Sequence, residues 1–224
     1  MDKFKINGPS KIRGEVSISG SKNAALPILA ATLLFDKNVT IKNLPRVKDI
    51  DTMLNLLKSL GRKITFKNNK KIATISKGKK NNFFAPYSLV KTMRAGILVL
   101  GPLLAKNKKA KVSSPGGCSI GVRPIDIHLK AISKLGVKIK IEKGYVNAKA
   151  QEGLFGSEIR FPKISVGATE NLILAACLAN GTTTIKNCAI EPEIKDLTNF
   201  LKTCLLYTSP SPRDRTRSRM PSSA

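Results

Sequence analysis

The chain of 224 residues contains 40 Lys and Arg against 14 Asp and Glu, so its formal net charge is +26. Its hydrophobic fraction of 42% can supply a core, but its apolar runs stop short of the roughly 18 residues of a membrane span. A single His and four Cys without CxxC spacing disfavour a metal site and a disulfide framework. We expect a reduced, cytoplasmic protein of one large or two small domains, with no metal and no membrane segment.

The positive charge has two interpretations. A basic excess is typical of proteins that bind nucleic acid or acidic ligands. Many of the lysines, however, lie in Asn- and Lys-rich stretches such as 67–71 and 77–82, which lack the interleaved aromatic residues of a single-strand binder. We expect a lysine-rich solvated surface that helps to attract a polyanionic substrate, and no nucleic-acid partner. A basic nucleic-acid-binding domain is the alternative.

Apolar spacing predicts three similar units along the chain. After two short alternating segments, at 4–6 and 16–18, the first unit is helix 24–34, strand 39–41, helix 47–60 and hairpin strands 64–66 and 72–75. The second is helix 87–105, strand 111–113, helix 124–135 and hairpin strands 137–141 and 145–148. The third is helix 166–179, strand 182–185 and a helix through 194–201. Leu60-Gly61 recurs as Leu135-Gly136, which supports an internal repeat.

The third unit does not finish in the same way. From Cys204 onward neither helical nor strand periodicity survives, and basic residues change from Lys to Arg. We expect residues 204–224 to be disordered and foreign to the gene, resembling translated sequencing-adaptor sequence. A genuine basic Ser/Arg tail is the alternative.

The stretch from Ser114 to His128 places several reactive or charged side chains in a glycine-rich loop that leads into a predicted helix. Cys118 stands directly after two glycines, and Pro124 suits the first helical position because it lacks an N–H group. A helix N-terminus receives anions through its free N–H groups and its dipole. A Pro-Gly-Gly turn with an incidental cysteine is the alternative interpretation.

Four motifs, in order along the chain, resemble those of the UDP-N-acetylglucosamine 1-carboxyvinyltransferases, the MurA group of the enolpyruvyl transferase family. They are residues 20–27 (GSKNAALP), 91–95 (KTMRA), 115–128 (PGGCSIGVRPIDIH) and 165–171 (SVGATEN). The resemblance extends over about residues 1–203. It implies an α/β fold of the inside-out type, in which three repeats of helix, strand, helix and hairpin form one domain and substrates bind between two such domains.

The resemblance also divides the chain. It implies that residues 1–20 are strands of a second domain that is essentially missing, that 21–203 form the three-repeat domain, and that 204–224 are an artefactual tail. One wall of the cleft, with the carboxylate that would deprotonate the sugar hydroxyl, would then be absent. We therefore expect the 224-residue chain to be inactive alone, and a non-catalytic UDP-sugar-binding fragment is the alternative function.

The implied reaction moves the enolpyruvyl group of phosphoenolpyruvate onto the 3′-hydroxyl of UDP-N-acetylglucosamine and releases phosphate, with no cofactor. This is the first committed step of peptidoglycan synthesis. Cys118 resembles the family's proton donor, which also forms a covalent adduct, and Lys22 and Arg94 match its catalytic cations. The residues matched to substrate contacts are Lys22, Asn23, Arg94, Arg123, Pro124, Ile125, Asp126, Ile127, Lys163, Ile164, Ser165, Val166 and Gly167.

Three further residues receive weaker assignments. Cys177 and Cys188 are expected to be inert core thiols. His128 is expected to orient the loop or to pack, with an isolated catalytic base as the less favoured role. Because Arg94 stands among apolar residues of an expected helix, where an arginine is rarely left unpaired, it is a strong candidate for function even without the motif.

Overall fold

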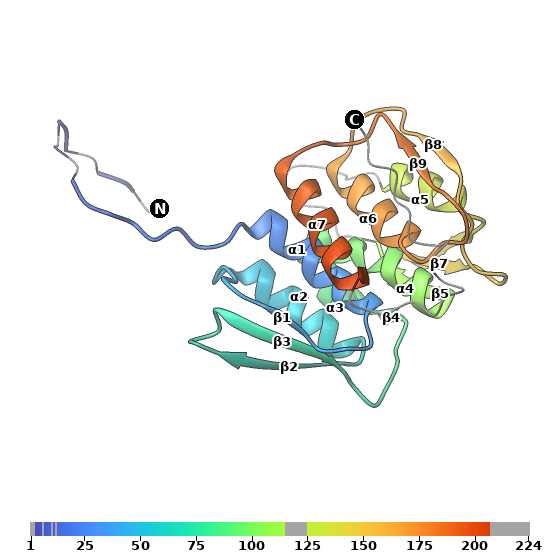
Figure 1. Ribbon diagram of the computed structural model, residues 1–224, viewed down its shortest axis with the longest axis horizontal. Coiled ribbons are helices and arrows are strands. Elements are labelled where there is room, and N and C mark those ends of the chain that lie inside the picture. Colours follow the sequence, from blue (N-terminus) through green and yellow to red (C-terminus); the bar gives the residue numbers. More distant parts are fainter. Residues whose placement is uncertain (1–2, 6, 10, 12, 115–124, 207–224) are drawn as a thin grey trace.

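The computed structural model describes residues 3–5, 7–9, 11, 13–114 and 125–206 (Figure 1). The first unit comprises α1 (Lys22–Ala31), η1 (Thr32–Leu34), β1 (Val39–Ile41), α2 (Lys48–Ser59), β2 (Arg62–Lys67) and β3 (Ile72–Lys77). The second comprises β4 (Phe84–Ala85), α3 (Tyr87–Val90), η2 (Arg94–Val99), α4 (Leu100–Asn107), β5 (Lys109–Ser113), α5 (Asp126–Ser133), β6 (Lys138–Glu142) and β7 (Tyr145–Lys149). The third comprises β8 (Glu158–Arg160), α6 (Val166–Ala176), β9 (Thr184–Lys186) and α7 (Pro192–Leu206).

The strands of the described residues form one sheet in each unit. The first sheet has the order β1-β3-β2 and the second the order β4-β5-β7-β6. In both, the single strand of the unit pairs antiparallel with the second strand of the hairpin, as Thr40 opposite Thr74 and Lys111 opposite Asn147 show. The third sheet pairs β8 parallel to β9, just as β4 runs parallel to β5. This shared pairing supports the repeat that the sequence predicted.

The helices α1, α4 and α6 form the centre of the domain, and the sheets lie outside them. These helices are apolar on most of their surface, so they bury nearly all of it: Leu29, Leu104 and Leu172 have no exposed side-chain surface. Helix α1 packs on α2 and α7, and α4 and α5 both pack on α6. Helices inside and sheets outside are the arrangement expected for the enolpyruvyl transferase fold, with the three-stranded sheet along one edge in Figure 1.

The predicted helix over 87–105 is wrong as a single element. It is interrupted at Met93, whose extended backbone (φ −140°, ψ 115°) separates the one-turn helix α3 from η2. The turn brings Gly96 so near Val90 that a Cβ on Gly96 would stand 3.1 Å from the valine side chain. Apolar content alone could not reveal this break, because Leu89 and Val90 before it and Ile97 and Leu98 after it are all apolar. The short strands β4 and β8 were likewise not predicted.

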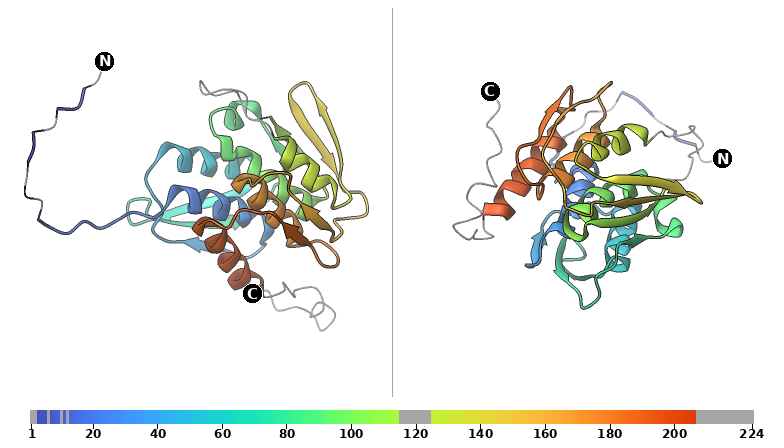
Figure 2. Two further views of the ribbon diagram at one scale, coloured as in Figure 1. Left: turned by 90° about the horizontal axis from the view of Figure 1, so that it is seen from above. Right: turned by 90° about the vertical axis from the view of Figure 1, so that its right-hand side faces the viewer.

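The described residues before α1 extend away from the domain in Figure 1 and in the left view of Figure 2. Its described residues form no strand, and Phe4, Val16 and Ile18 are 99%, 89% and 86% exposed. The strand predicted at 16–18 is therefore not formed here, because no described segment lies beside it to supply hydrogen bonds. Whether these residues belong to a second domain stays a prediction.

The last helix continues across the predicted boundary at Thr203. Helix α7 ends at Leu206, so Cys204 lies within it and not in an irregular tail. The remainder of the predicted tail, 207–224, lies outside the described residues. Across the described part of the chain, none of the helices combines the length and the apolar character needed to cross a membrane.

Candidate functional site

A pocket of about 810 Å³ opens between helices of all three units. Its walls come from the starts of α1 and α2, the turn into η2, the start of α5, the loop and first turns of α6, and Glu193 of α7. Ten of the predicted substrate-binding residues line it: Lys22, Asn23, Arg94, Ile125, Ile127, Lys163, Ile164, Ser165, Val166 and Gly167. Residues from four separate segments of sequence therefore meet at one site.

The N-termini of several helices meet at this pocket. Ser21 caps α1, where its Oγ accepts from the Ala24 N–H at 3.4 Å, and Ser165 caps α6 through the Ala168 N–H at the same distance. Beside the second cap, the N–H groups of Val166 and Gly167 have no partner among the described residues. Free N–H groups and aligned dipoles favour an anion at this place.

Lys22 is held at the rim of the pocket by a carboxylate. Its Nζ lies 2.8 Å from Oδ2 of Asp49, an acidic residue in the first turn of α2, and both side chains remain more than one-third exposed. An exposed pair of this kind contributes little to stability, about 0–1 kcal/mol. The ammonium is therefore positioned by Asp49 but remains able to turn toward a ligand.

Arg94 reaches the pocket because the helix is broken before it. The residue begins η2 on an exposed turn and lines the pocket, so it is not the buried arginine that a continuous apolar helix predicted. No described residue forms an ion pair with it. Its guanidinium can therefore bind a phosphate or carboxylate of a ligand in the two-pronged geometry that arginine favours.

His128 forms part of the pocket wall from α5 and is buried, with 6% of its surface exposed. Its Nδ1 lies 3.2 Å from Nδ2 of Asn171, a fully buried residue of α6. Burial, and to a smaller extent the charge of Arg94, lower the pKa of the imidazole to about 4, while Asp126 partly opposes them. The ring is therefore neutral at pH 7.

Glu170 contributes a buried carboxyl to the same pocket. The residue is 5% exposed, and burial raises the pKa of its side chain to about 8, with Glu193 and Glu191 adding to the shift. It is therefore largely protonated at pH 7 and can donate a hydrogen bond. Glu170, Glu193 and Asp49 also line the pocket but were not predicted from the sequence, although a Glu-Asn pair inside an otherwise apolar helix was a usable signal.

The remaining predicted residues separate into two groups. Asp126 stands in the first turn of α5, exposed and outside the pocket lining, so the structure does not place it with the others. Cys118, Arg123 and Pro124 lie outside the described residues. Among the other cysteines, burial raises the pKa of Cys177 to about 12, which agrees with an unreactive core thiol.

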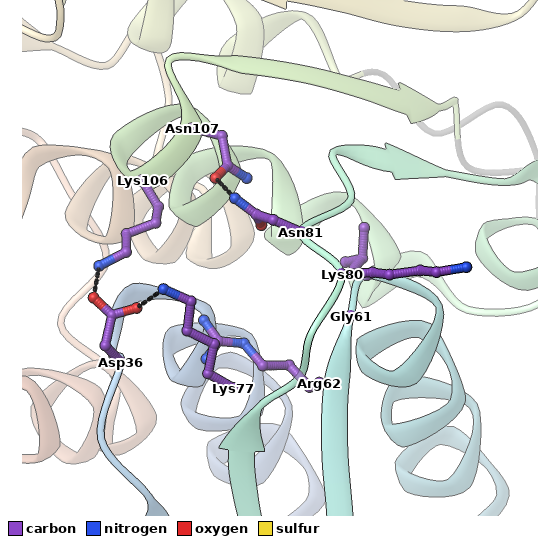
Figure 3. A pocket seen from close by; sticks show the side chains of 9 residues that line it. Asp36, Gly61, Arg62, Lys77, Lys80, Asn81, Lys106 and Asn107 are labelled. Atoms are coloured by element: carbon purple, nitrogen blue, oxygen red, sulfur yellow. Dashed lines mark hydrogen bonds and ion pairs between the residues drawn. The ribbon is translucent and has the colours of Figure 1, made fainter.

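A second, much smaller hollow of about 80 Å³ lies between β2, β3 and α4 (Figure 3). Asp36 lines it, 2.9 Å from Nζ of Lys77 and 2.6 Å from Nζ of Lys106. Arg62 donates to the carbonyl oxygens of Phe35 and Leu33 at 2.7 and 2.6 Å, while Lys80 points away from the carboxylate. Apart from Lys80, its charges pair within the protein, as expected of a structural cluster.

Comparison with known families agrees with this fold and site. The sequence model of the EPSP synthase (3-phosphoshikimate 1-carboxyvinyltransferase) family matches residues 6–206. The chain therefore belongs to this family of enolpyruvyl transferases. Solved structures support the fold: an enolpyruvyl transferase, NikO from Streptomyces tendae, superposes with a TM-score of 0.69 at 20% identity, covering 87% of this chain and 45% of its own. An EPSP synthase from Acinetobacter baumannii gives 0.66 at 19%, covering 81% and 42%.

Among proteins of closer sequence, the resemblance to the UDP-N-acetylglucosamine 1-carboxyvinyltransferases is confirmed. The chain is 67% identical over 201 residues to the enzyme of that name from Pelagibacter ubique, covering 90% of this chain and 48% of the relative. It is 55% identical over 201 residues to that of Acinetobacter guillouiae, with the same coverage. The chain thus spans about half the length of the relatives it matches.

Proposed function

We propose that this chain supplies the sugar-nucleotide half of the active site of a UDP-N-acetylglucosamine 1-carboxyvinyltransferase. The whole enzyme would transfer the enolpyruvyl group from phosphoenolpyruvate to the sugar 3′-hydroxyl and release phosphate. The observation that supports this most strongly is the convergence of ten residues, matched through the family resemblance in four separate segments, on one pocket of about 810 Å³. A pocket of this size suits a nucleotide sugar.

The donors and cations that line the pocket suit two anionic ligands, a nucleotide sugar and phosphoenolpyruvate. The α6 N-terminus, with the free N–H groups of Val166 and Gly167, suits a pyrophosphate, and Lys163 stands beside it. Lys22 and Arg94 face the same space from α1 and η2 and suit the phosphate and carboxylate of phosphoenolpyruvate. Apolar residues such as Ile125 and Ile127 provide the surface against which the uridine would pack.

Cys118 would complete the site as proton donor to the methylene carbon and as the residue alkylated by fosfomycin. In the cell, the reaction would begin peptidoglycan synthesis in the cytoplasm. We expect the 224-residue chain to bind UDP-N-acetylglucosamine but to release no phosphate from phosphoenolpyruvate, because it spans about half the length of its relatives. Nucleotide-sugar-dependent phosphate release by the chain would contradict this expectation.

Protection of Cys118 from alkylation tests the assignment directly. The chain is treated with iodoacetamide with and without saturating UDP-N-acetylglucosamine, and labelling at each of its four cysteines is followed by peptide mass spectrometry. We expect the ligand to slow labelling of Cys118 about tenfold and to leave Cys188 and Cys204 unchanged as internal controls. Labelling of Cys118 that UDP-N-acetylglucosamine does not alter would contradict the proposal.

The cationic wall is tested by substitution. Arg94→Ala should weaken UDP-N-acetylglucosamine or phosphoenolpyruvate binding about tenfold or more, because one charge-assisted bidentate contact is lost. Arg160→Ala is the matched control, since Arg160 is exposed on β8 and does not line the pocket. Equal affinities of the two variants in calorimetric titrations would remove Arg94 from the site.

A further inference from the structure

The side-chain amide of Asn171 occupies an unusual position between two backbone groups of the broken second-unit helix. Its Oδ1 accepts from the Gly101 N–H at 2.8 Å, and its Nδ2 donates to the Ile97 carbonyl at 3.0 Å. These two groups, four residues apart, are the ones that a regular α-helix would join to each other. Asn171 therefore bridges the junction of η2 and α4 from the neighbouring helix α6.

The two backbone contacts fix which way the amide points. An N–H group can only donate and a carbonyl oxygen can only accept, so reversing the amide of Asn171 would lose both bonds. The second proton of Nδ2 then faces Nδ1 of His128 at 3.2 Å. Because Nδ1 must accept this bond, the neutral imidazole of His128 has its own proton on Nε2.

The other edge of the ring faces the N-terminus of α6. A Cβ placed on Gly167 would lie 3.3 Å from Cε1 and 3.5 Å from Nε2 of His128, so the ring edge lies against this turn. Both residues line the pocket, and Nε2 has no hydrogen-bond partner among the described residues. Nε2 is not among the fully enclosed side-chain atoms that lack a partner in the described residues, so its N–H borders the pocket and is available to a ligand there.

We propose that His128 is a ligand-positioning residue whose Nε2–H donates to a phosphoryl oxygen bound at the N-terminus of α6, and that Asn171 positions His128 by fixing this tautomer. The inference rests on the proposed function and names two residues that act in the same site. The free N–H groups of Val166 and Gly167 beside Nε2 would contact the same phosphoryl group.

A neutral donor is suited to this place. The imidazole stays uncharged at neutral pH because it is buried and near Arg94, while Asp126 opposes this only in part. The full positive charges would then come from Arg94 and Lys163 at the open side of the pocket, and the buried side would supply neutral N–H groups. This division avoids placing two cations in contact inside the protein.

Because His128 is the single histidine of the sequence, nitrogen NMR of the 224-residue chain can observe it without overlap. In the chain labelled with ¹⁵N-histidine, we expect a protonated Nε2 and an unprotonated Nδ1 at pH 7. Addition of UDP-N-acetylglucosamine, UDP or inorganic pyrophosphate should shift the Nε2 resonance, and uridine should not. A protonated Nδ1, or an Nε2 that stays unshifted when UDP is bound, would overturn the inference.

Variants separate positioning from simple packing. His128→Phe keeps a ring but loses the donor, so we expect about tenfold weaker binding of UDP-N-acetylglucosamine. His128→Gln retains an N–H group near the Nε2 position and should recover most of this loss. If His128→Phe binds as tightly as the original chain, the inference fails while the proposed function stands. If the original chain binds neither UDP nor UDP-N-acetylglucosamine, both fail.

Discussion

The small hollow and the large pocket of this domain shift the pKa of a carboxyl group in opposite directions. In the small hollow, Asp36 is paired with Lys77 and Lys106, and these contacts lower the pKa of its carboxyl to about 2. In the large pocket, Glu170 forms no ion pair with a described residue, and burial, with the charges of Glu193 and Glu191, raises the pKa of its carboxyl to about 8. At pH 7 the carboxyl group of Asp36 is therefore ionised and that of Glu170 is largely protonated, because their pKa values of about 2 and about 8 lie on opposite sides of neutrality.

This difference indicates where the fold leaves room for a ligand. The charges of the small hollow bond mainly to one another or to backbone carbonyls, so they stabilise the junction of β2, β3 and α4 (Figure 3). The large pocket instead contains donors without partners among the described residues: the N–H groups at the start of α6, Nε2 of His128 and the guanidinium of Arg94. Unsatisfied groups of this kind are typical of binding sites.

Among the substitutions that test this contrast, we expect the largest loss of stability for a change at Asn171. Asn171→Leu keeps the shape of the side chain but leaves the Gly101 N–H, the Ile97 carbonyl and His128 without their contacts. We expect the free energy of unfolding to fall by about 3 kcal/mol or more. Urea denaturation measures it, with Asn199→Leu on the exposed surface of α7 as the control. A loss below about 1 kcal/mol would contradict the bridging role.

A smaller loss is expected in the structural hollow. Arg62→Met removes the donor to the carbonyl oxygens of Leu33 and Phe35, which end the short helix η1. We expect a loss of about 2 kcal/mol in urea denaturation and no change in UDP-N-acetylglucosamine affinity. Arg46→Met, at an exposed position before α2, is the control. Weaker ligand binding by Arg62→Met would show that the two hollows are not independent.

The buried carboxyl of the pocket predicts a dependence on pH. Glu170 keeps its proton up to about pH 8 in the folded chain but loses it above its ordinary pKa of 4.5 when unfolded. The folded state therefore binds more protons between these values, and this contribution to stability is lost as the pH rises through that window.

Glu170→Gln should remove this dependence. We expect the variant to be more stable than the original chain by about 2 kcal/mol at pH 8, with a smaller difference near pH 5, in thermal unfolding. Glu158→Gln, which removes an exposed carboxylate paired with Lys186, serves as the control. A stability difference for Glu170→Gln that does not change with pH would mean that the carboxyl is not buried as described.

The smallest effect is expected at Asp36. Its carboxylate and its two lysine partners are all at least 30% exposed, so solvent screens the pairs and Asp36→Asn should cost less than about 1 kcal/mol. Because the pKa is lowered, this contribution is present above the ordinary value of 3.8 and disappears as the pH falls toward 2. The cost should shrink further in high salt. A cost above 2 kcal/mol would contradict this assignment.

Much of the fold followed from local patterns. Helix α2 and the hairpin of β2 and β3 were predicted within two residues, because their apolar spacing is regular and Asn68-Asn69 marks the turn. The break at Met93 was not, because apolar residues continue on both sides of it. The contrast shows that regular apolar spacing predicts the bounds of an element, whereas a continuous apolar run does not show where its backbone turns.

The site divides in a similar way. Lys22 and Arg94 were identified from motifs of which they are part, and Lys163 from the resemblance just before the motif at 165–171. Glu170 and the bridge made by Asn171 depend on which helices meet, so their roles became visible only with the packing of α5 and α6 around them. The resemblance predicted residues that line the pocket, and the structure added the residues that contact them.

The most direct test is a calorimetric titration of the 224-residue chain with UDP-N-acetylglucosamine. If the pocket binds a nucleotide sugar, we expect saturable binding at one site per chain, and competition by UDP but not by uridine at equal concentration. Binding that is absent at millimolar ligand, or that uridine matches in affinity, would contradict the assignment of this pocket to a nucleotide sugar.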